Sequence, residues 1–114
     1  MIVAKEFVFD SAHKLKWHKG KCKNLHGHTY KLQILVEGKL NKQGIVIDFG
    51  DMKKIIKREV IEKLDHRYLN EIIKNPTAEN ISIWIWEELK DKIKDLKEIR
   101  LWETPTSFAI YNGK

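Results

Sequence analysis

The chain has 114 residues, which is enough for one modest hydrophobic core and too few for two. Apolar residues make up 42% of it, with only 6 Gly and 2 Pro, a composition that excludes a disordered chain. The formal net charge of +6 favours an anionic partner, although Lys and Glu are interspersed as on an ordinary solvated surface. We therefore expect a single domain over residues 1–114.

The sequence contains no sign of secretion or membrane insertion. Its N-terminus lacks a basic start followed by an apolar run of roughly 7 to 15 residues, and no segment approaches the roughly 18 apolar residues of a membrane span. The single cysteine, Cys22, has no partner for an internal disulfide. These features predict a cytoplasmic protein without a membrane partner.

Two half-buried strands are predicted in the first third of the chain. Apolar residues recur with period two from Ile2 to Phe9, and the alternation returns from Tyr30 to Val36. The polar stretch Lys14 to Asn24 lies between them and is long enough to carry function. A turn region, Glu37 to Gly44, and a short strand, Ile45 to Ile47, are expected to follow.

Two helices and a last pair of strands are predicted after residue 47. Asp48 or Asp51 can cap the first helix, and Thr77 can cap the second after the break at Asn75-Pro76. Strand-like segments follow at Ile99 to Trp102 and Phe108 to Tyr111. The apolar stripes at helical spacing are Met52, Ile55, Ile56, Val60 and Leu64 in the first helix, and Ile81, Trp84, Ile85, Leu89 and Ile93 in the second.

This order of elements, ββααββ, predicts an α+β domain in which a four-stranded antiparallel sheet carries two helices on one face. Ile83 and Trp86 add a second apolar edge to the second helix. A helix that is apolar over more than half its circumference must bury more than one face, so we expect it to contact both the sheet and a neighbouring subunit.

Three histidines are placed where two strands could bring them together. His13 closes the first strand, and His26 and His28 stand one residue apart on the approach to the second. Period two puts His26 and His28 on one strand face, and Gly27 between them allows close backbone approach. If the strands pair antiparallel, the three imidazoles converge, and three neutral imidazoles with one open position are a common catalytic zinc site.

Other titratable residues have roles that their pattern alone leaves open. Cys22, four residues before the His-Gly-His run, could complete a closed structural zinc site or act as a general base beside the metal. His18 matches no strand face and is interpreted as a loop histidine. Asp65 and His66 form an acid–base pair only if their side chains bend toward each other, which requires a position outside regular helix. Glu103 by itself has the features of an ordinary exposed glutamate.

Six short motifs occur in the order and spacing of one known family. The sequence resembles the 6-pyruvoyl tetrahydropterin synthase / 6-carboxytetrahydropterin synthase family over nearly the whole chain, and its Cys-x3-His-Gly-His run is the most specific element of the resemblance. The six motifs are Phe9-Asp10-Ser11-Ala12-His13, Cys22-Lys23-Asn24-Leu25-His26-Gly27-His28, Gly44-Ile45-Val46-Ile47-Asp48-Phe49, Leu64-Asp65-His66-Arg67-Tyr68-Leu69-Asn70, Pro76-Thr77-Ala78-Glu79-Asn80 and Glu103-Thr104.

The resemblance implies a zinc centre with a neighbouring base. By position, His13, His26 and His28 would ligate Zn²⁺, and Cys22 would be the general base rather than a fourth ligand. The implied fold is the tunnelling fold (T-fold), in which trimers close their sheets into a barrel and two trimers stack into a homohexamer with active sites at the interfaces.

The resemblance also implies the rest of the site. Asp65 and His66 would complete the acid–base group from a neighbouring subunit. Glu103 would anchor the pterin by accepting hydrogen bonds from its ring N–H and amino group, a geometry that suits a bidentate carboxylate.

The implied substrate is 7,8-dihydroneopterin triphosphate, an anion that would account for the positive charge of the chain. The compact length is similar to that of members that make 6-carboxy-5,6,7,8-tetrahydropterin and release triphosphate and acetaldehyde, on the route to 7-deazaguanine nucleosides of tRNA such as queuosine. The 6-pyruvoyl tetrahydropterin synthases of biopterin synthesis are the alternative within the family.

Two hypotheses from other classes remain. A nucleic-acid-binding module is suggested by the pI near 9.4 and the four tryptophans, but the chain lacks a basic-aromatic strand motif, and we expect no nucleic-acid partner. A non-catalytic zinc-stabilised protein would use Cys22 as a fourth ligand and hold coordinatively saturated zinc.

Overall fold

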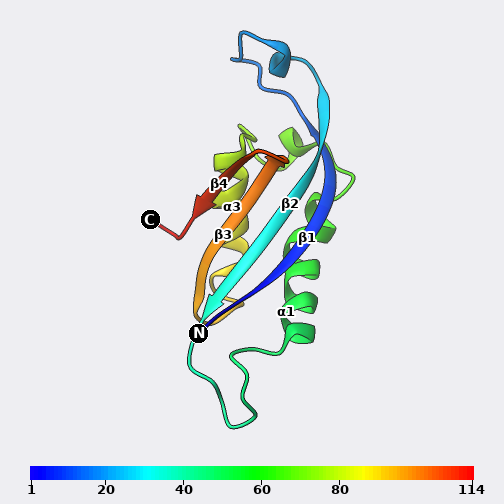
Figure 1. Ribbon diagram of the computed structural model, residues 1–114. Coiled ribbons are helices and arrows are strands. Elements are labelled where there is room, and N and C mark those ends of the chain that lie inside the picture. Colours follow the sequence, from blue (N-terminus) through cyan, green and yellow to red (C-terminus); the bar gives the residue numbers. More distant parts are fainter.

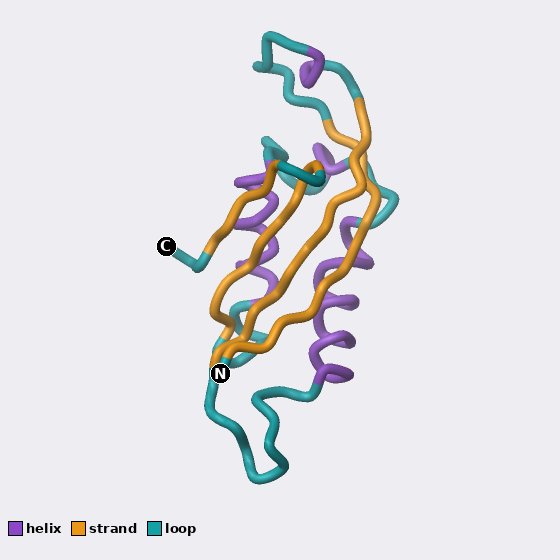
Figure 2. The backbone as a smooth tube through the Cα atoms, viewed as in Figure 1, coloured by secondary structure: helices purple, strands orange, loops and turns teal.

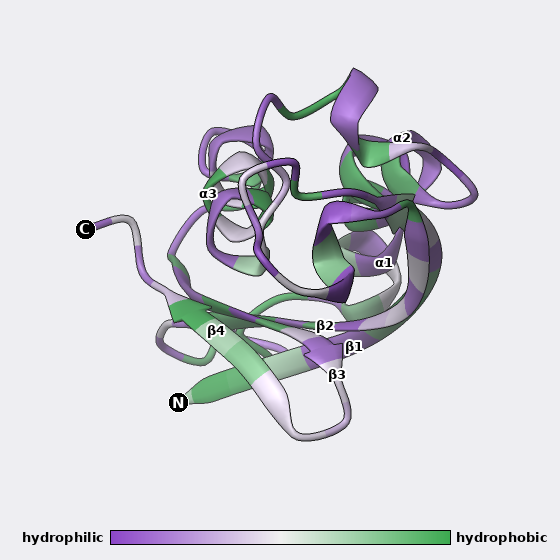
Figure 3. Cartoon of the chain, turned by 90° about the horizontal axis from the view of Figure 1, so that it is seen from above, coloured by the Kyte–Doolittle hydropathy of each residue, from purple (hydrophilic) through white to green (hydrophobic).

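The computed structural model describes all residues 1–114 as a two-layer α+β domain (Figure 1). Four antiparallel strands form one sheet in the order β1-β2-β3-β4, and the helices lie together on one of its faces, as Figure 3 shows from above. This architecture confirms the predicted ββααββ order. The strands are β1 (Ile2–His13), β2 (His26–Glu37), β3 (Leu96–Thr104) and β4 (Ser107–Tyr111), and the two main helices are α1 (Phe49–Ile56) and α3 (Ala78–Leu89).

The long hairpin of β1 and β2 follows from the period-two pattern. The two strands pair antiparallel along their whole lengths, with His13 opposite His26. Odd-numbered residues of β1 face the helices, where the rings of Phe9 and Tyr30 stack with centroids 5.0 Å apart. Both strands extend beyond the apolar alternation that predicted them. All three clustered histidines therefore lie within regular strands rather than in the connecting loop.

The first predicted helix is one helical run with a π-helical turn inside it. The side chain of Asp48 accepts a hydrogen bond from the Asp51 backbone N–H at 2.9 Å and so caps the helix as predicted. Helix α1 continues into the π-helical turn η2 (Lys57–Ile61) and the short α2 (Glu62–Leu64). The predicted stripe faces the sheet and buries Met52, Ile56, Val60 and Leu64 completely.

The second helix begins as predicted and ends earlier. Thr77 Oγ1 accepts a hydrogen bond from the Asn80 backbone N–H at 3.1 Å at the start of α3. The helix stops at Leu89, so the prediction that Ile93 belongs to it is wrong. The N–H groups of Lys92 and Ile93 both donate to the Leu89 carbonyl at 2.9 Å, which closes a tight turn that still buries Ile93 in the core.

The excess apolar surface of α3 is covered largely within the chain. Trp86 packs edge to face on Tyr111 of β4 with ring centroids 5.8 Å apart, and Trp84 packs against the core. Ile83 alone of this second edge remains 40% exposed. The expectation that a neighbouring subunit covers this helix therefore rests on a much smaller surface than the sequence suggested.

The predicted strand at residues 45–47 is absent. Asn41 organises a turn there: its side-chain oxygen accepts hydrogen bonds from the N–H groups of Gln43 and Ile45 at 2.9 and 3.2 Å. Val46 and Ile47 then pack half-buried against the core without pairing to a strand. This loop and the loop of residues 14–25 extend past opposite ends of the sheet (Figure 2).

The sheet face away from the helices is open and partly apolar. Val8, Phe108 and Ile110 point outward with exposures of 65%, 50% and 54%. Figure 3 shows hydrophobic colouring along β4 and at the start of β1. β1 and β4 are also the two edges of the sheet, with unpaired backbone groups. No helix is long and apolar enough to cross a membrane.

Candidate active site and metal centre

Three imidazoles meet at the end of the β1–β2 hairpin, on the sheet face toward the helices. His13 is fully buried, and His26 and His28 are half-buried. One ring nitrogen from each lies within 4.8 Å of the others, and the ring centroids are 4.5 to 5.1 Å apart. The antiparallel register produces this cluster, because it sets His26 opposite His13 and leaves His28 on the same face.

Backbone carbonyls fix the tautomers of two of these histidines. Nδ1 of His13 lies 2.7 Å from the Pro76 carbonyl oxygen, and Nδ1 of His26 lies 2.7 Å from the Asn24 carbonyl oxygen. A carbonyl can only accept, so each Nδ1 carries the proton and each neutral ring presents a lone pair at Nε2. These two Nε2 atoms face each other at 2.9 Å. Two lone pairs at that distance repel each other unless a proton or a metal ion lies between or beside them.

The state of His28 also favours metal binding. Nε2 of His28 is buried and has no hydrogen-bond partner, although buried ring nitrogens are normally satisfied. Burial lowers the pKa of His28, and the neighbouring imidazoles add to that effect, so the ring favours its neutral, metal-binding form. The donor set of three neutral Nε2 atoms, two of them oriented by backbone carbonyls, fits Zn²⁺.

Glu103 reaches this cluster from β3. It lies at a β-bulge, where the pairing shifts between Trp102 and Thr104, and bulges commonly re-aim a side chain beside an active site. Its Oε1 is 3.3 Å from Nε2 of His13 and 3.4 Å from Nε2 of His28. The contact with His13 is the main cause that lowers the pKa of Glu103, so the carboxylate is ionised at neutral pH.

The charge balance of the cluster favours a bound cation. Burial by itself lowers the pKa of His13, but the Glu103 carboxylate and the Pro76 carbonyl outweigh burial, and the pKa of His13 is raised. A buried ring that attracts a proton under these conditions also attracts a metal ion.

Asp65 and His66 follow α2 and bend toward each other. Nδ1 of His66 lies 3.0 Å from Oδ2 of Asp65, and His66 has a φ of 56°, outside the helix, as an adjacent acid–base pair requires. β1 holds the pair: the Asp10 N–H donates to Asp65 at 3.0 Å, and the Asp10 carbonyl accepts from the His66 N–H at 2.6 Å. The pKa of Asp65 is lowered, first by the Asp10 N–H.

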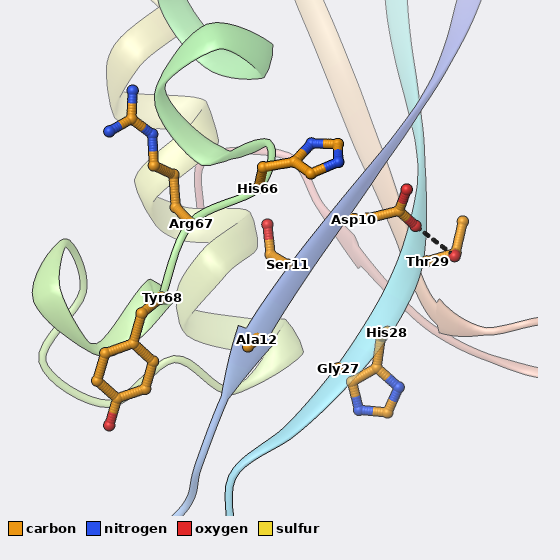
Figure 4. A pocket seen from close by; sticks show the side chains of 9 residues that line it. All are labelled: Asp10, Ser11, Ala12, Gly27, His28, Thr29, His66, Arg67 and Tyr68. Carbon is orange, nitrogen blue, oxygen red and sulfur yellow. Dashed lines mark hydrogen bonds between the residues drawn. The ribbon is translucent and has the colours of Figure 1, made fainter.

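This pair does not join the three imidazoles of its own chain. Asp10, Asp65 and His66 form a second cluster, with ligand atoms within 4.8 Å of one another. Figure 4 shows His66 beside a pocket along β1, together with outward-facing Asp10 and Thr29, whose side chains share a hydrogen bond of 2.5 Å. His28 lines the same pocket, but the ligand atoms of the three-histidine cluster and of the acid–base pair form two separate groups.

The cysteine and the loop histidine stand apart from the metal-type cluster. Cys22 is half-buried in the 3-10 turn η1 (Lys21–Lys23), and its carbonyl accepts from the Leu15 N–H at 2.7 Å. The group of convergent ligand atoms does not include its sulfur. Nδ1 of His18 accepts from the Gly20 N–H at 2.9 Å, in agreement with the interpretation of His18 as a loop histidine.

Sequence reasoning missed the backbone groups and lysines around the site. The carbonyls of Asn24 and Pro76 orient imidazoles, and no side-chain pattern reports such a role. Lys14, Lys16 and Lys74 line one pocket that contains no carboxylate. Their separation in sequence concealed this cationic surface, although lysine clustering after His13 was a signal.

The sheet order and the histidine cluster together define a protein of the tunnelling-fold class with a metal-type site. Comparison with known proteins agrees: the sequence model of the family described as 6-pyruvoyl tetrahydropterin synthase matches residues 2–114. The chain belongs to this family. The resemblance read from the six motifs is thereby confirmed.

Individual relatives differ in their named activities. The chain is 42% identical to the 6-carboxy-5,6,7,8-tetrahydropterin synthase of Haemophilus influenzae, with 96% of each chain covered. It is 44% identical to the dihydroneopterin monophosphate aldolase of Pyrococcus furiosus, covering 83% of this chain and 82% of that one. The solved 6-pyruvoyl tetrahydropterin synthase of Caenorhabditis elegans superposes with a TM-score of 0.86 at 31% identity, covering 100% of this chain and 97% of that chain.

Proposed function

We propose that the chain is a zinc-dependent pterin synthase that converts 7,8-dihydroneopterin triphosphate to 6-carboxy-5,6,7,8-tetrahydropterin with loss of triphosphate and acetaldehyde. The observation that carries the proposal is the convergence of three imidazole Nε2 atoms, two of them in tautomers set by carbonyls. The Haemophilus influenzae relative supports the choice of product because nearly the whole of both chains aligns.

His13, His26 and His28 would hold the zinc ion. When bound, zinc supplies Lewis-acid chemistry that lowers the pKa of the hydroxyls on the substrate side chain. Glu103 would bind the pterin ring, because an ionised carboxylate accepts two parallel hydrogen bonds from the ring N–H and the amino group.

Cys22 would move a proton at the substrate side chain as general base. The absence of its sulfur from the convergent ligand group supports this role over that of a fourth ligand. We expect Cys22→Ala to keep zinc and fold while turnover falls by about 10²-fold or more. Loss of zinc and of thermal stability in this variant would instead favour the zinc-stabilised structural protein.

Asp65 and His66 would supply the second proton transfer from a neighbouring subunit. Their ligand atoms form a group separate from the chain's own three imidazoles, which supports action in trans. His26→Ala and His66→Ala should each be inactive, and oligomers refolded from an equal mixture should regain activity in about a quarter of their sites. A mixture that stays inactive, although mixed oligomers form, would contradict action in trans.

We further propose that the protein forms a homo-oligomer, a hexamer of two stacked trimers. Two unpaired sheet edges, β1 and β4, and the outward-facing Val8, Phe108 and Ile110 give each chain surfaces to join to another copy. Light scattering should give about six times the chain mass. A mass near the 13.5 kDa of one chain would contradict the assembly.

The phosphate chain of the substrate would lie at the pocket of Lys14, Lys16 and Lys74. None of these three lysines forms an ion pair, and no carboxylate lines the pocket. The side chain of Asn70 accepts from the Lys14 N–H at 3.0 Å and donates to the Lys14 carbonyl at 2.9 Å, which fixes the backbone beside His13.

Product analysis tests the reaction most directly. With the triphosphate substrate we expect inorganic triphosphate, acetaldehyde and the 6-carboxy product in equal amounts. Formation of 6-pyruvoyl tetrahydropterin without acetaldehyde would favour the biopterin-type reaction. The Pyrococcus furiosus relative supports a second candidate, an aldolase acting on dihydroneopterin monophosphate, and turnover of the monophosphate alone would establish it. Oligonucleotides should not be retained even at low salt.

A further inference from the structure

Glu103 occupies an unusual position for a residue that only anchors a pterin ring. Its Oε1 touches the two nitrogens, Nε2 of His13 and Nε2 of His28, that would themselves face the metal. The contact with His28 does not have hydrogen-bond geometry, since this nitrogen has no hydrogen-bond partner at all. The carboxylate oxygen therefore lies among the ring lone pairs without being bonded to a ring proton of His28.

The two distances from Glu103 match those within a metal coordination shell. In a tetrahedral zinc site with bonds of about 2.0 to 2.1 Å, two ligand atoms lie about 1.63 bond lengths apart, or about 3.3 to 3.4 Å. The Oε1 atom of Glu103 is 3.3 Å from Nε2 of His13 and 3.4 Å from Nε2 of His28. Both are close to ligand-to-ligand distances, whereas the Nε2 atoms of His13 and His26 lie closer together, at 2.9 Å, and would have to move apart around a metal ion.

We infer that Glu103 is the fourth ligand of the metal centre in the resting protein and that it leaves the metal when a pterin ring binds. The inference deepens the proposed function and rests on its zinc site. A carboxylate has two oxygens, and pairing with the ring N–H and amino group of a pterin uses both of them. One side chain cannot hold that geometry and remain on the metal.

This exchange would couple recognition to activation. Without a pterin, the centre is closed by three histidines and one carboxylate, as in saturated sites that do not bind further ligands. Binding of the ring withdraws Glu103 and opens the fourth position for the hydroxyls of the substrate side chain. Glu103 lies at a β-bulge, and this irregularity would allow its side chain to turn from the histidines to a bound ring.

Cobalt substitution can follow this ligand directly, because Co²⁺ in the zinc site has visible absorption bands that respond to each ligand. The proteins are wild type, Glu103→Gln and, as a matched control, Glu98→Gln, a glutamate of the same strand whose carboxylate instead contacts Arg100. Pterin, the bare ring without side-chain hydroxyls, is the probe, and a change toward the spectrum of Glu103→Gln reports the departure of Glu103. Zinc affinity is measured separately by competition with a chelator.

We expect Glu103→Gln to shift the cobalt bands of the resting protein and to weaken zinc binding by at least about tenfold, while Glu98→Gln changes neither. Pterin should shift the bands of wild type toward those of Glu103→Gln. Identical cobalt spectra and zinc affinities for wild type and Glu103→Gln would overturn the inference, whatever the activity. Failure of the proposed reaction is separate: it would appear as normal metal spectra with no product from wild-type protein.

Discussion

Removing zinc should lower the melting temperature of the protein sharply. The Nε2 atoms of fully buried His13 and half-buried His26 lie 2.9 Å apart. Two facing lone pairs at this distance are unfavourable unless a cation is present. Because the unfolded chain does not preserve the three-histidine geometry, zinc binds the folded state and shifts the unfolding equilibrium. A chelator is therefore the simplest perturbation of the site.

The size of the effect can be worked out from the length of the chain. With free zinc at about a thousand times its dissociation constant, binding adds about 4.1 kcal/mol to the free energy of unfolding. At about 2.1 cal/mol/K per residue, 114 residues have an unfolding entropy of about 0.24 kcal/mol/K near the midpoint. The ratio of these values gives a loss of about 15 to 20 °C on chelation.

Differential scanning calorimetry at one fixed protein concentration, with and without a chelator, measures this shift. Restoring zinc should restore the melting temperature. His26→Ala should melt near the chelated protein and respond little to zinc, whereas His18→Ala, which removes the loop histidine, should behave as wild type. A wild-type melting temperature that is unchanged by complete zinc removal would refute the reasoning from the facing lone pairs.

Three further predictions test other parts of the structure. Lys74→Glu should raise KM for a phosphorylated substrate at least several-fold with little change in kcat, as measured by steady-state kinetics at low salt. Leu32→Ala, at a fully buried β2 position, should cost about 2 to 5 kcal/mol in denaturant unfolding, whereas exposed Leu40→Ala should cost under about 0.5 kcal/mol. Because the pKa of Asp65 is lowered in the folded state, its ionised form stabilises the fold above the ordinary carboxyl pKa of about 3.9, and this advantage over Asp65→Asn should vanish as the pH falls from about 5 to 2.

The sequence was sufficient for the fold order and for the metal-type cluster because both depend on simple periods. Alternation in the first two strands decided which face each residue would take, and the antiparallel pairing then set His13 opposite His26. The caps at Asp48 and Thr77 were equally local, since each is a side chain bonded to a backbone N–H three residues later. Features of this kind depend only on a few neighbouring residues, so the sequence predicts them.

What the sequence could not predict depends on contacts between distant segments. The Pro76 carbonyl that orients His13 lies 63 residues away in the sequence. It is a backbone group, so no residue type in the sequence predicts its role. The bulge at Glu103 is a mismatch between two strands and has no signature within either strand. The false strand at residues 45–47 shows the converse, because three apolar residues satisfied the local pattern although they follow the Asn41 turn and pack on the core without pairing to a strand.

The placement of the two reactive clusters supports the proposed assembly. In a β-strand, neighbouring side chains point to opposite faces, so β1 directs His13 toward the helices and Asp10 away from them. The Asp65–His66 pair is bonded to the backbone N–H and carbonyl of Asp10, at the edge of the sheet. One copy thus carries a three-histidine cluster and an acid–base pair whose ligand atoms do not converge. The proposed action in trans would bring both groups to one substrate, because a second copy would supply the acid–base pair beside the first copy's histidines.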